Sequence, residues 1–140
     1  MKHIVLTICA LLLGGLLFAQ NVEGVWETFD TKRQKPMSHV RIYKQDGKLY
    51  GVVIKVLDEE YKTCTRCSGD NKNKPTVGLM VIRGLEKKGD KWELDDGLLD
   101  PISGLIIDGE LWMVSPDKLK IKGSWGFISD TQTWTRIKQE

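Results

Sequence analysis

The sequence predicts an all-β fold, a single antiparallel up-and-down barrel of about eight strands. Short segments with alternating apolar residues run from residue 24 to residue 137, and turn signals separate nearly every pair of them. No window of sufficient length in this range has the spacing of an amphipathic helix. In addition, a tryptophan stands in the first segment and an arginine near the end of the last, which favours closure of the sheet into a barrel.

Trp26 and Arg136 are the predicted structural pair that closes the barrel. The tryptophan belongs to the motif Gly24-Val25-Trp26, and the arginine lies near the end of the final segment. If the first and last strands are neighbours, the indole plugs one end of the core and the guanidinium stacks on its face as a cation–π pair. The guanidinium donors can then reach backbone carbonyls, and the closed sheet has no exposed edge.

Residues 1–19 are predicted to be a secretory signal peptide, and residues 20–140 the barrel domain. Lys2 and His3 precede an almost unbroken apolar run from Ile4 to Leu17, and Ala19 supplies the small residue at the cleavage site. This run is shorter than the roughly 20 residues that a membrane-spanning helix requires. We therefore expect cleavage after Ala19, a periplasmic or secreted protein, and no membrane span in the mature chain.

The charges of the mature chain are nearly balanced. The full sequence has 21 basic and 19 acidic residues, and removal of residues 1–19 takes away one basic residue, Lys2, and leaves 20. No long run of like charges concentrates an electric field on part of the chain. This balance argues against nucleic acid as a partner.

The first half of the mature chain is expected to form three strands. A polar turn that contains proline, residues 30–37, follows the strand at Trp26, and apolar residues alternate in the next strand at residues 40–43. Asp46-Gly47 is a two-residue hairpin signal that leads into a strand at residues 48–57. In that strand the residues on the expected inner face are Tyr50, Val52, Ile54 and Val56.

The second half is expected to add further strands at residues 79–85, 91–94, 105–107, 111–114 and 118–125. Turn signals separate them at residues 87–90 and 100–104, and Asp108-Gly109 is expected to be another hairpin. The clearest alternation is in residues 118–125, where lysines share one face and the apolar residues share the other. This strand is therefore expected to be half-buried.

The candidate interior or ligand-lining residues are Tyr50, Val52, Ile54, Trp92, Leu119, Ile121 and Trp125. An eight-stranded barrel is either filled by side chains or wide enough for one small ligand. Both possibilities remain open, because the aromatic side chains can fill the interior or leave a cavity for an apolar or amphipathic molecule. If Trp112 points outward, it is a candidate for a partner-binding patch.

The connection from Asp58 to Lys74 has no strand pattern and holds Cys64 and Cys67, the only two cysteines beyond the signal. A disulfide between them fits an oxidising compartment and would stiffen the loop. A redox-active pair is an alternative, although no helix follows to stabilise a thiolate. Half a zinc site is another, although His39 is the only histidine beyond the signal.

The sequence predicts no catalytic residues, no metal site and no cofactor, and we expect a protein that is not an enzyme. His39 lies beside Ser38 without a recognisable nucleophile motif. The acidic pairs Glu59-Glu60 and Asp95-Asp96 are expected to be solvated, because adjacent residues of a strand point to opposite faces. No glycine-rich loop of the kind that binds phosphate is present in the sequence.

Motifs spread over most of the mature chain resemble a known family. They are Gly24-Val25-Trp26, residues 46–51, Asn73-Lys74-Pro75, Gly78-Leu79, Gly84-Leu85, Trp92, Asp100-Pro101, Gly104, residues 119–123 and residues 131–136. With these motifs the sequence looks like the exported bacterial family known as domain of unknown function 2147. The Gly-x-Trp motif with a late arginine is also similar to lipocalins and their calycin relatives. The resemblance implies a lipocalin-like β-barrel, and it brings no assigned activity, cofactor or catalytic residue.

Two functions of different classes remain. The first is a carrier that holds a small apolar or amphipathic ligand in the barrel or at its mouth. The second is a filled barrel that acts as an envelope protein–protein interaction module through residues 58–75 and exposed aromatic side chains. The sequence does not specify an oligomeric state.

Overall fold

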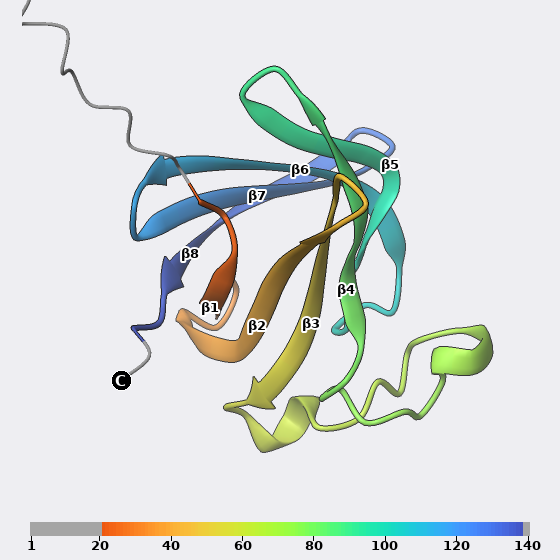
Figure 1. Cartoon of the computed structure of the whole chain (residues 1–140). Coiled ribbons are helices and arrows are strands. Elements are labelled where there is room, and N and C mark those ends of the chain that lie inside the picture. Colours follow the sequence, from red (N-terminus) through yellow and green to blue (C-terminus); the bar gives the residue numbers. More distant parts are fainter. Residues whose placement is uncertain (1–20, 139–140) are drawn as a thin grey trace, which may run out of the picture.

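The structure, a computed structural model, describes residues 21–138, and these form eight antiparallel strands in one closed barrel (Figure 1). The strands are β1 Gly24–Asp30, β2 Lys35–Gln45, β3 Lys48–Val56, β4 Met80–Lys88, β5 Lys91–Leu99, β6 Ile106–Ser115, β7 Lys118–Trp125 and β8 Ile128–Arg136. Each strand pairs with its neighbours in sequence, and β8 returns to pair with β1. The predicted up-and-down barrel is confirmed. The predicted signal peptide, residues 1–19, lies outside the described residues.

The connections differ between the two ends of the barrel. Because the strands alternate in direction, the connections after β2, β4 and β6 share one end, and each of them has two residues: 46–47, 89–90 and 116–117. The connections after β1, β3, β5 and β7 share the other end, and the longest of them, residues 57–79, carries two short 3₁₀ helices, η1 Glu59–Tyr61 and η2 Gly69–Asn71. Within residues 21–138, no helix is long and apolar enough to cross a membrane.

The end with the short hairpins is closed by Trp26. Its side chain is fully buried, and its Nε1 donates a hydrogen bond to the carbonyl of Val22 at 2.9 Å. The guanidinium of Arg136 lies 4.3 Å from the centre of the indole ring, and Trp26 and Arg136 face each other in the β1–β8 pairing. Gly24 leaves room for this contact, because a Cβ there would lie 2.6 Å from Nη1 of Arg136. We call this end the closed end.

Arg136 also ties separate segments together through its hydrogen-bond donors. Its Nη1 donates to the carbonyl of Glu23 at 2.8 Å, and its Nη2 donates to that of Asn21 at 2.5 Å. Its Nε donates to the carbonyl of Pro116, in the β6–β7 hairpin, at 2.9 Å. The planar guanidinium of this β8 residue therefore joins the N-terminal segment to the β6–β7 hairpin.

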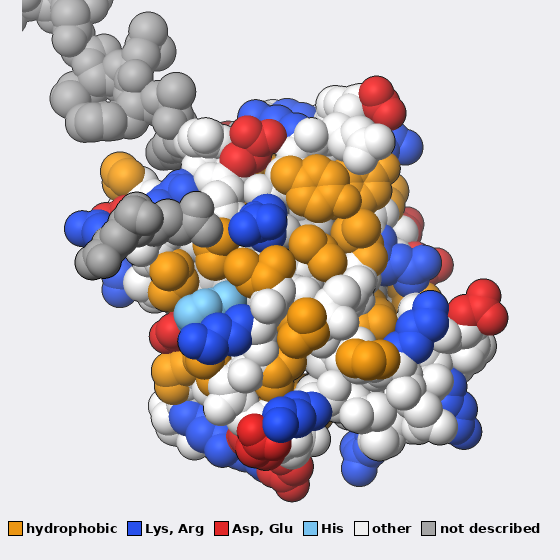
Figure 2. Space-filling model, turned by 60° about the horizontal axis from the view of Figure 1, so that its bottom comes forward, with side chains coloured by type: hydrophobic (Ala, Val, Ile, Leu, Met, Phe, Trp, Pro, Cys, Tyr) orange, Lys and Arg blue, Asp and Glu red, His pale blue; other side chains and the backbone are white. Residues whose placement is uncertain are grey.

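Up to the bulge at Ile54, the inward face of β3 is the opposite of the predicted one, and after it Val56 packs against the core as predicted. Leu49 and Val53 are buried in the core, whereas Tyr50, Val52 and Ile54 are half-buried on the outer side, where Tyr50 stacks on Tyr43. The pairing with β2 jumps from Val53 to Lys55, so Ile54 is an extra residue in a bulge. Both faces of β3 are apolar, and alternation alone therefore pointed to the wrong one. Figure 2 shows that hydrophobic side chains also gather on the surface of the barrel.

The predicted hairpin at Asp108-Gly109 is wrong, because β6 runs without interruption from Ile106 to Ser115. Gly109 is buried in this strand, and a Cβ there would lie 2.5 Å from Cγ of Leu98. The Oδ1 of Asp108 accepts a hydrogen bond from the backbone N–H of Asp96 at 2.9 Å. Glycine is therefore required here by the close approach of a neighbouring side chain and not by a turn.

The other four predicted interior residues divide between core and surface. Leu119 and Trp92 are buried in the core, and so is Ile121. Trp125 is 60% exposed, although alternation along β7 sets it on the same face as the two buried residues of that strand. It is the last residue of β7, so its side chain lies beyond the end of the packed interior. The prediction of an interior position for Trp125 is wrong for this reason.

Replacing Arg136 by alanine is expected to lower the free energy of unfolding by about 2–3 kcal/mol, because the cation–π contact and the charge-assisted hydrogen bonds are lost together. Urea denaturation followed by tryptophan fluorescence measures the change. Arg83→Ala is the matched control, because Arg83 is exposed on β4. Equal stability of the two variants would show that Arg136 does not hold the closed end.

Candidate functional site

The barrel is hollow at the end opposite Trp26. A cavity of about 150 Å³ opens there, and we call this end the mouth. Most of its wall is apolar: Met37, Val40, Val53, Val81, Leu98, Leu99, Pro101, Ile102, Ile107, Ile121 and Trp134. An engineered apolar cavity of about this volume binds benzene, so the space admits one ring or a short alkyl chain. The barrel is thus filled at the closed end and hollow at the mouth.

A few polar groups interrupt the apolar wall. Thr28 and Ser38 are both buried, and their hydroxyl oxygens are 2.8 Å apart, which makes a hydrogen-bonded pair between β1 and β2. Each hydroxyl has one proton, and the pair uses only one of the two, so one O–H donor is left over. On β8 the cavity-lining residues are Asp130, Gln132 and Trp134. The Trp134 Nε1 donates to the Gln132 Oε1 at 3.2 Å.

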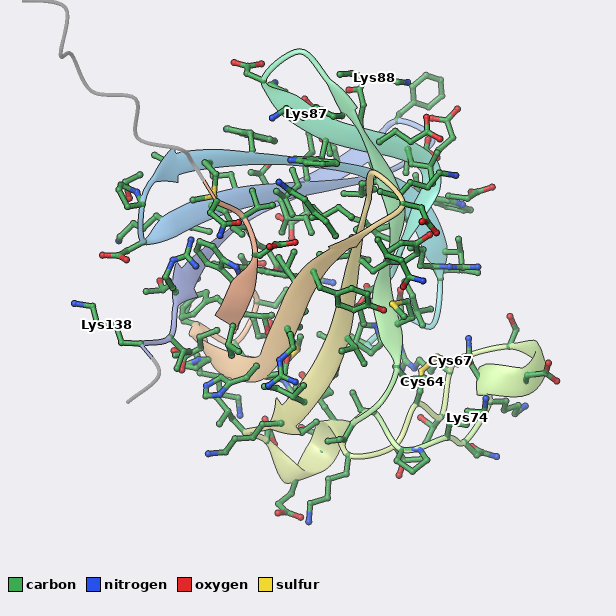
Figure 3. All side chains as sticks on the ribbon, viewed as in Figure 1. Cys64, Cys67, Lys74, Lys87, Lys88 and Lys138 are labelled. Carbon is green, nitrogen blue, oxygen red and sulfur yellow. A yellow bond between two sulfur atoms is a disulfide. The ribbon has the colours of Figure 1, made fainter. Side chains whose placement is uncertain are left out.

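The connection between β3 and β4 folds back against the mouth. Cys64 and Cys67 form the predicted disulfide, and both residues are buried (Figure 3). The backbone N–H of Cys64 donates to the carbonyl of Lys74, and that of Asn73 donates back to the carbonyl of Cys64, both at 2.9 Å. The outgoing and returning halves of the connection are therefore hydrogen-bonded to each other, and residues 63–75 form a small hairpin that we call the disulfide hairpin.

The disulfide packs on the turn between β5 and β6, residues 100–105. The Cys64 Sγ lies 3.5 Å from the carbonyl oxygen of Pro101, which is itself a cavity-lining residue. A side chain at Gly104 would collide with the backbone of Arg66 and Cys67, and this glycine has a φ of +75° that other residues rarely adopt. The disulfide hairpin therefore supports one wall of the mouth.

At the same end of the barrel, the buried carboxylate of Asp30 joins the end of β1 to η1. Its oxygens accept hydrogen bonds from the backbone N–H groups of Lys32 at 2.9 Å and Arg33 at 3.1 Å, and from the hydroxyl of Tyr61 at 3.0 Å. Burial acts to raise the pKa of Asp30, but these hydrogen bonds outweigh it and lower the pKa below its ordinary value. Asp30 thus stabilises the mouth in its ionised form.

The cavity includes only one of the predicted ligand-lining residues, Ile121. Trp92 and Leu119 belong to the core without lining the cavity, and the other four lie outside the packed interior. Sequence reasoning missed Thr28 and Trp134, although a signal existed for both. Thr28 is two residues after Trp26, and Trp134 is two before Arg136, so alternation from the closing pair indicates which residues share a face.

Among residues 21–138, no group of three or more His, Cys, Asp or Glu side chains is placed to hold a metal ion. His39 lies on the outer side of β2, where its Nε2 is 3.1 Å from the Glu27 Oε2. Trp112 is half-buried on β6, and the ammonium of Lys91 lies 4.6 Å from the centre of its ring.

Comparisons with known proteins identify the family and the fold. A family model described as an uncharacterized protein conserved in bacteria, DUF2147, matches residues 24–136. The chain belongs to the DUF2147 family. This confirms the family that the sequence motifs indicated.

Protein HP1028 from Helicobacter pylori has a solved structure that is similar to this DUF2147 barrel. The TM-score is 0.70 at 21% sequence identity, the match covers 84% of each chain, and HP1028 is described as a member of the lipocalin family. At this identity the likeness shows the fold alone, so the barrel is lipocalin-like. No curated protein matched the DUF2147 chain.

Replacing Cys64 and Cys67 together by alanine is expected to leave the DUF2147 barrel folded and to lower its free energy of unfolding by roughly 2 kcal/mol, the loop-closure contribution of so small a ring. Hydrogen exchange should become faster at residues 100–105, which the disulfide supports. Wild-type protein in dithiothreitol is the control and should match the variant. Loss of the β-sheet circular dichroism signal in either sample would contradict a merely supporting role.

Acid is expected to destabilise the mouth through Asp30. Because its pKa is lower in the folded chain than in the unfolded one, its stabilising contribution is fully present above the unfolded value of about 4 and is lost as the pH falls through the folded value. Asp30→Asn should therefore flatten the decrease in stability between about pH 5 and pH 2 in urea titrations. Asp70→Asn, on the exposed η2, is the control, and an equal flattening there would assign the effect to general charge.

Proposed function

We propose that this DUF2147 protein is an exported, non-catalytic binding protein that holds a small apolar or amphipathic molecule in the mouth of the barrel. The observation that carries the proposal is the cavity of about 150 Å³ with a mainly apolar wall, open to solvent opposite the plug of Trp26. Ligand sites in proteins are typically concave, mostly apolar and provided with a few polar groups that orient the ligand. The lipocalin description of HP1028 agrees with this proposal through the fold.

The volume of the cavity limits what it can enclose. Drug-sized ligands occupy pockets of about 300–1,000 Å³, so only part of such a molecule fits inside this barrel. One aromatic ring or a short alkyl chain fills the available space. A larger amphipathic ligand would leave its polar part at the mouth, beside the exposed Leu105 and Ile106 at the start of β6.

Export is part of the proposal, and two sequence features support it. Residues 1–19 have the composition of a secretory signal, and the Cys64–Cys67 disulfide is of a kind that persists in oxidising compartments. A carrier outside the cytoplasm would meet small apolar molecules that pass through the envelope.

The exposed tip of the β7–β8 hairpin favours a second function, an envelope interaction module. Trp125 is 60% exposed and Ile128 is 69% exposed, and Phe127 between them is completely exposed. Large apolar side chains in such a cluster are typical of surfaces that bind a partner. The 58–75 segment, which lies at the same end of the barrel, belongs to this proposal as a second surface. A photo-crosslinking residue at position 127 in the native host tests it, and the absence of any crosslinked protein would count against it.

The carrier function predicts that the same substitution weakens binding at one residue of β3 and leaves it unchanged at the adjacent one. Val53 lines the cavity and Val52 lies on the outer side, so Val53→Phe should fill the space and weaken binding of a benzene-sized probe at least about tenfold. Val52→Phe adds the same volume outside and should leave the affinity unchanged. Calorimetric titration with benzene or hexanol measures binding, and thermal unfolding confirms that both variants fold. Equal affinities would overturn the carrier function.

A further inference from the structure

The ionisable groups around the cavity all have one sign. Asp100 and Asp130 line it, and none of the lining residues is lysine, arginine or histidine. Arg33, in the neighbouring β1–β2 connection, contacts Glu60, and Nζ of Lys35, the first residue of β2, lies 2.5 Å from Oδ2 of Asp58. Lys32 of the same connection is exposed and does not line the cavity. A ligand that enters therefore meets carboxylates at the mouth without a cation to balance them.

The two carboxylates are held differently. Both oxygens of Asp100 are engaged in its own turn: Oδ1 accepts from the backbone N–H of Ile102 at 2.9 Å, and Oδ2 accepts from the hydroxyl of Ser103 at 2.8 Å. Asp130 is exposed at the start of β8, and its carboxylate accepts a long hydrogen bond, 3.4 Å, from the hydroxyl of Thr31. Asp100 is thus a fixed negative charge, and Asp130 is free to bind a ligand group.

The wall formed by β8 changes character with depth. Asp130, Gln132 and Trp134 all line the cavity at steps of two residues, and their exposure falls from exposed through half-buried to buried. A carboxylate stands at the mouth, an amide is in the middle, and an indole lies deepest. This order matches a molecule with a cationic head and an apolar tail.

We propose that the ligand is an amphiphilic amine, with its short tail in the cavity and its ammonium group beside Asp130. This inference rests on the proposed carrier function and adds the chemical class of the ligand. An ammonium can donate a charge-assisted hydrogen bond to the Asp130 carboxylate, and the negative charge of Asp100 strengthens the attraction. A fatty acid of equal length would bring a third carboxylate to the mouth, and like-charge repulsion would exclude it.

Three probes with about six carbons each, hexylamine, 1-hexanol and hexanoate, separate the head group from the tail. Calorimetric titration of the purified chain at neutral pH should show hexylamine binding at least about tenfold more tightly than hexanoate, because two carboxylates act with opposite sign on the two heads. Hexanol should bind with intermediate affinity. Raising the salt concentration should narrow the difference between the charged probes and leave hexanol unaffected.

Asp130→Asn should weaken hexylamine binding by up to about fivefold, the range expected for a partly exposed ion pair, and leave hexanol binding unchanged. The matched control is Asp90→Asn, which removes the same charge from the β4–β5 hairpin at the closed end. Retained hexanol affinity shows that each variant is folded with its cavity intact.

The outcomes separate this inference from the carrier function. If hexanol binds but hexanoate equals hexylamine, the amine preference is overturned and the carrier function stands. If Asp130→Asn behaves like Asp90→Asn, the role assigned to Asp130 is overturned. If none of the three probes binds, the carrier function fails and the amine preference fails with it.

Discussion

The contact between Trp26 and Arg136 is the constraint on which the closed barrel depends. The β6–β7 and β7–β8 seams are extended antiparallel ladders, whereas the β1–β8 ladder has two pairs, Trp26–Arg136 and Glu27–Thr135, followed by one hydrogen bond from the N–H of Ile137 to the carbonyl of Val25. So short a ladder gives few backbone hydrogen bonds to hold the sheet closed. Arg136 compensates, because its guanidinium covers the indole and donates to carbonyls of the N-terminal segment and the β6–β7 hairpin. The contacts of the Arg136 side chain thus stabilise the β1–β8 seam, where the backbone pairing is short.

Closure at one end also explains why the space lies at the other. The two-residue hairpins at the closed end leave the interior to be filled by Trp26 and by leucines such as Leu49 and Leu119, which are completely buried. At the mouth three of the four connections are longer, those after β1, β3 and β5, and the inward side chains of the strand ends include small ones such as Thr28 and Ser38. One barrel therefore combines a rigid plug with a site that can accept a guest.

Much of the fold follows from local patterns, and the errors have physical causes. The Asp46-Gly47 hairpin and the strand from Lys118 to Trp125 were predicted correctly, because turn chemistry and alternation determine them locally. The inner face of β3 was not, since both of its faces are apolar and a bulge at Ile54 changes the alternation. Gly109 was predicted to be a turn residue, but glycine is needed there because the side chain of Leu98, on β5, lies too close for a Cβ. Most of the cavity wall escaped prediction for the same reason, because it depends on contacts between strands.

Selectivity of the proposed binding site would arise at its rim, because an apolar wall distinguishes poorly among small apolar ligands. The rim residues belong to turns and strand ends, where the packed core does not require an apolar side chain. The disulfide hairpin supports this rim, because it packs on the β5–β6 turn. Cys64 packs on Pro101, the residue that follows Asp100, so the covalent ring helps to keep that carboxylate at the edge of the cavity. The disulfide thereby stabilises the rim that would distinguish one guest from another, while the Trp26–Arg136 contact holds the barrel itself.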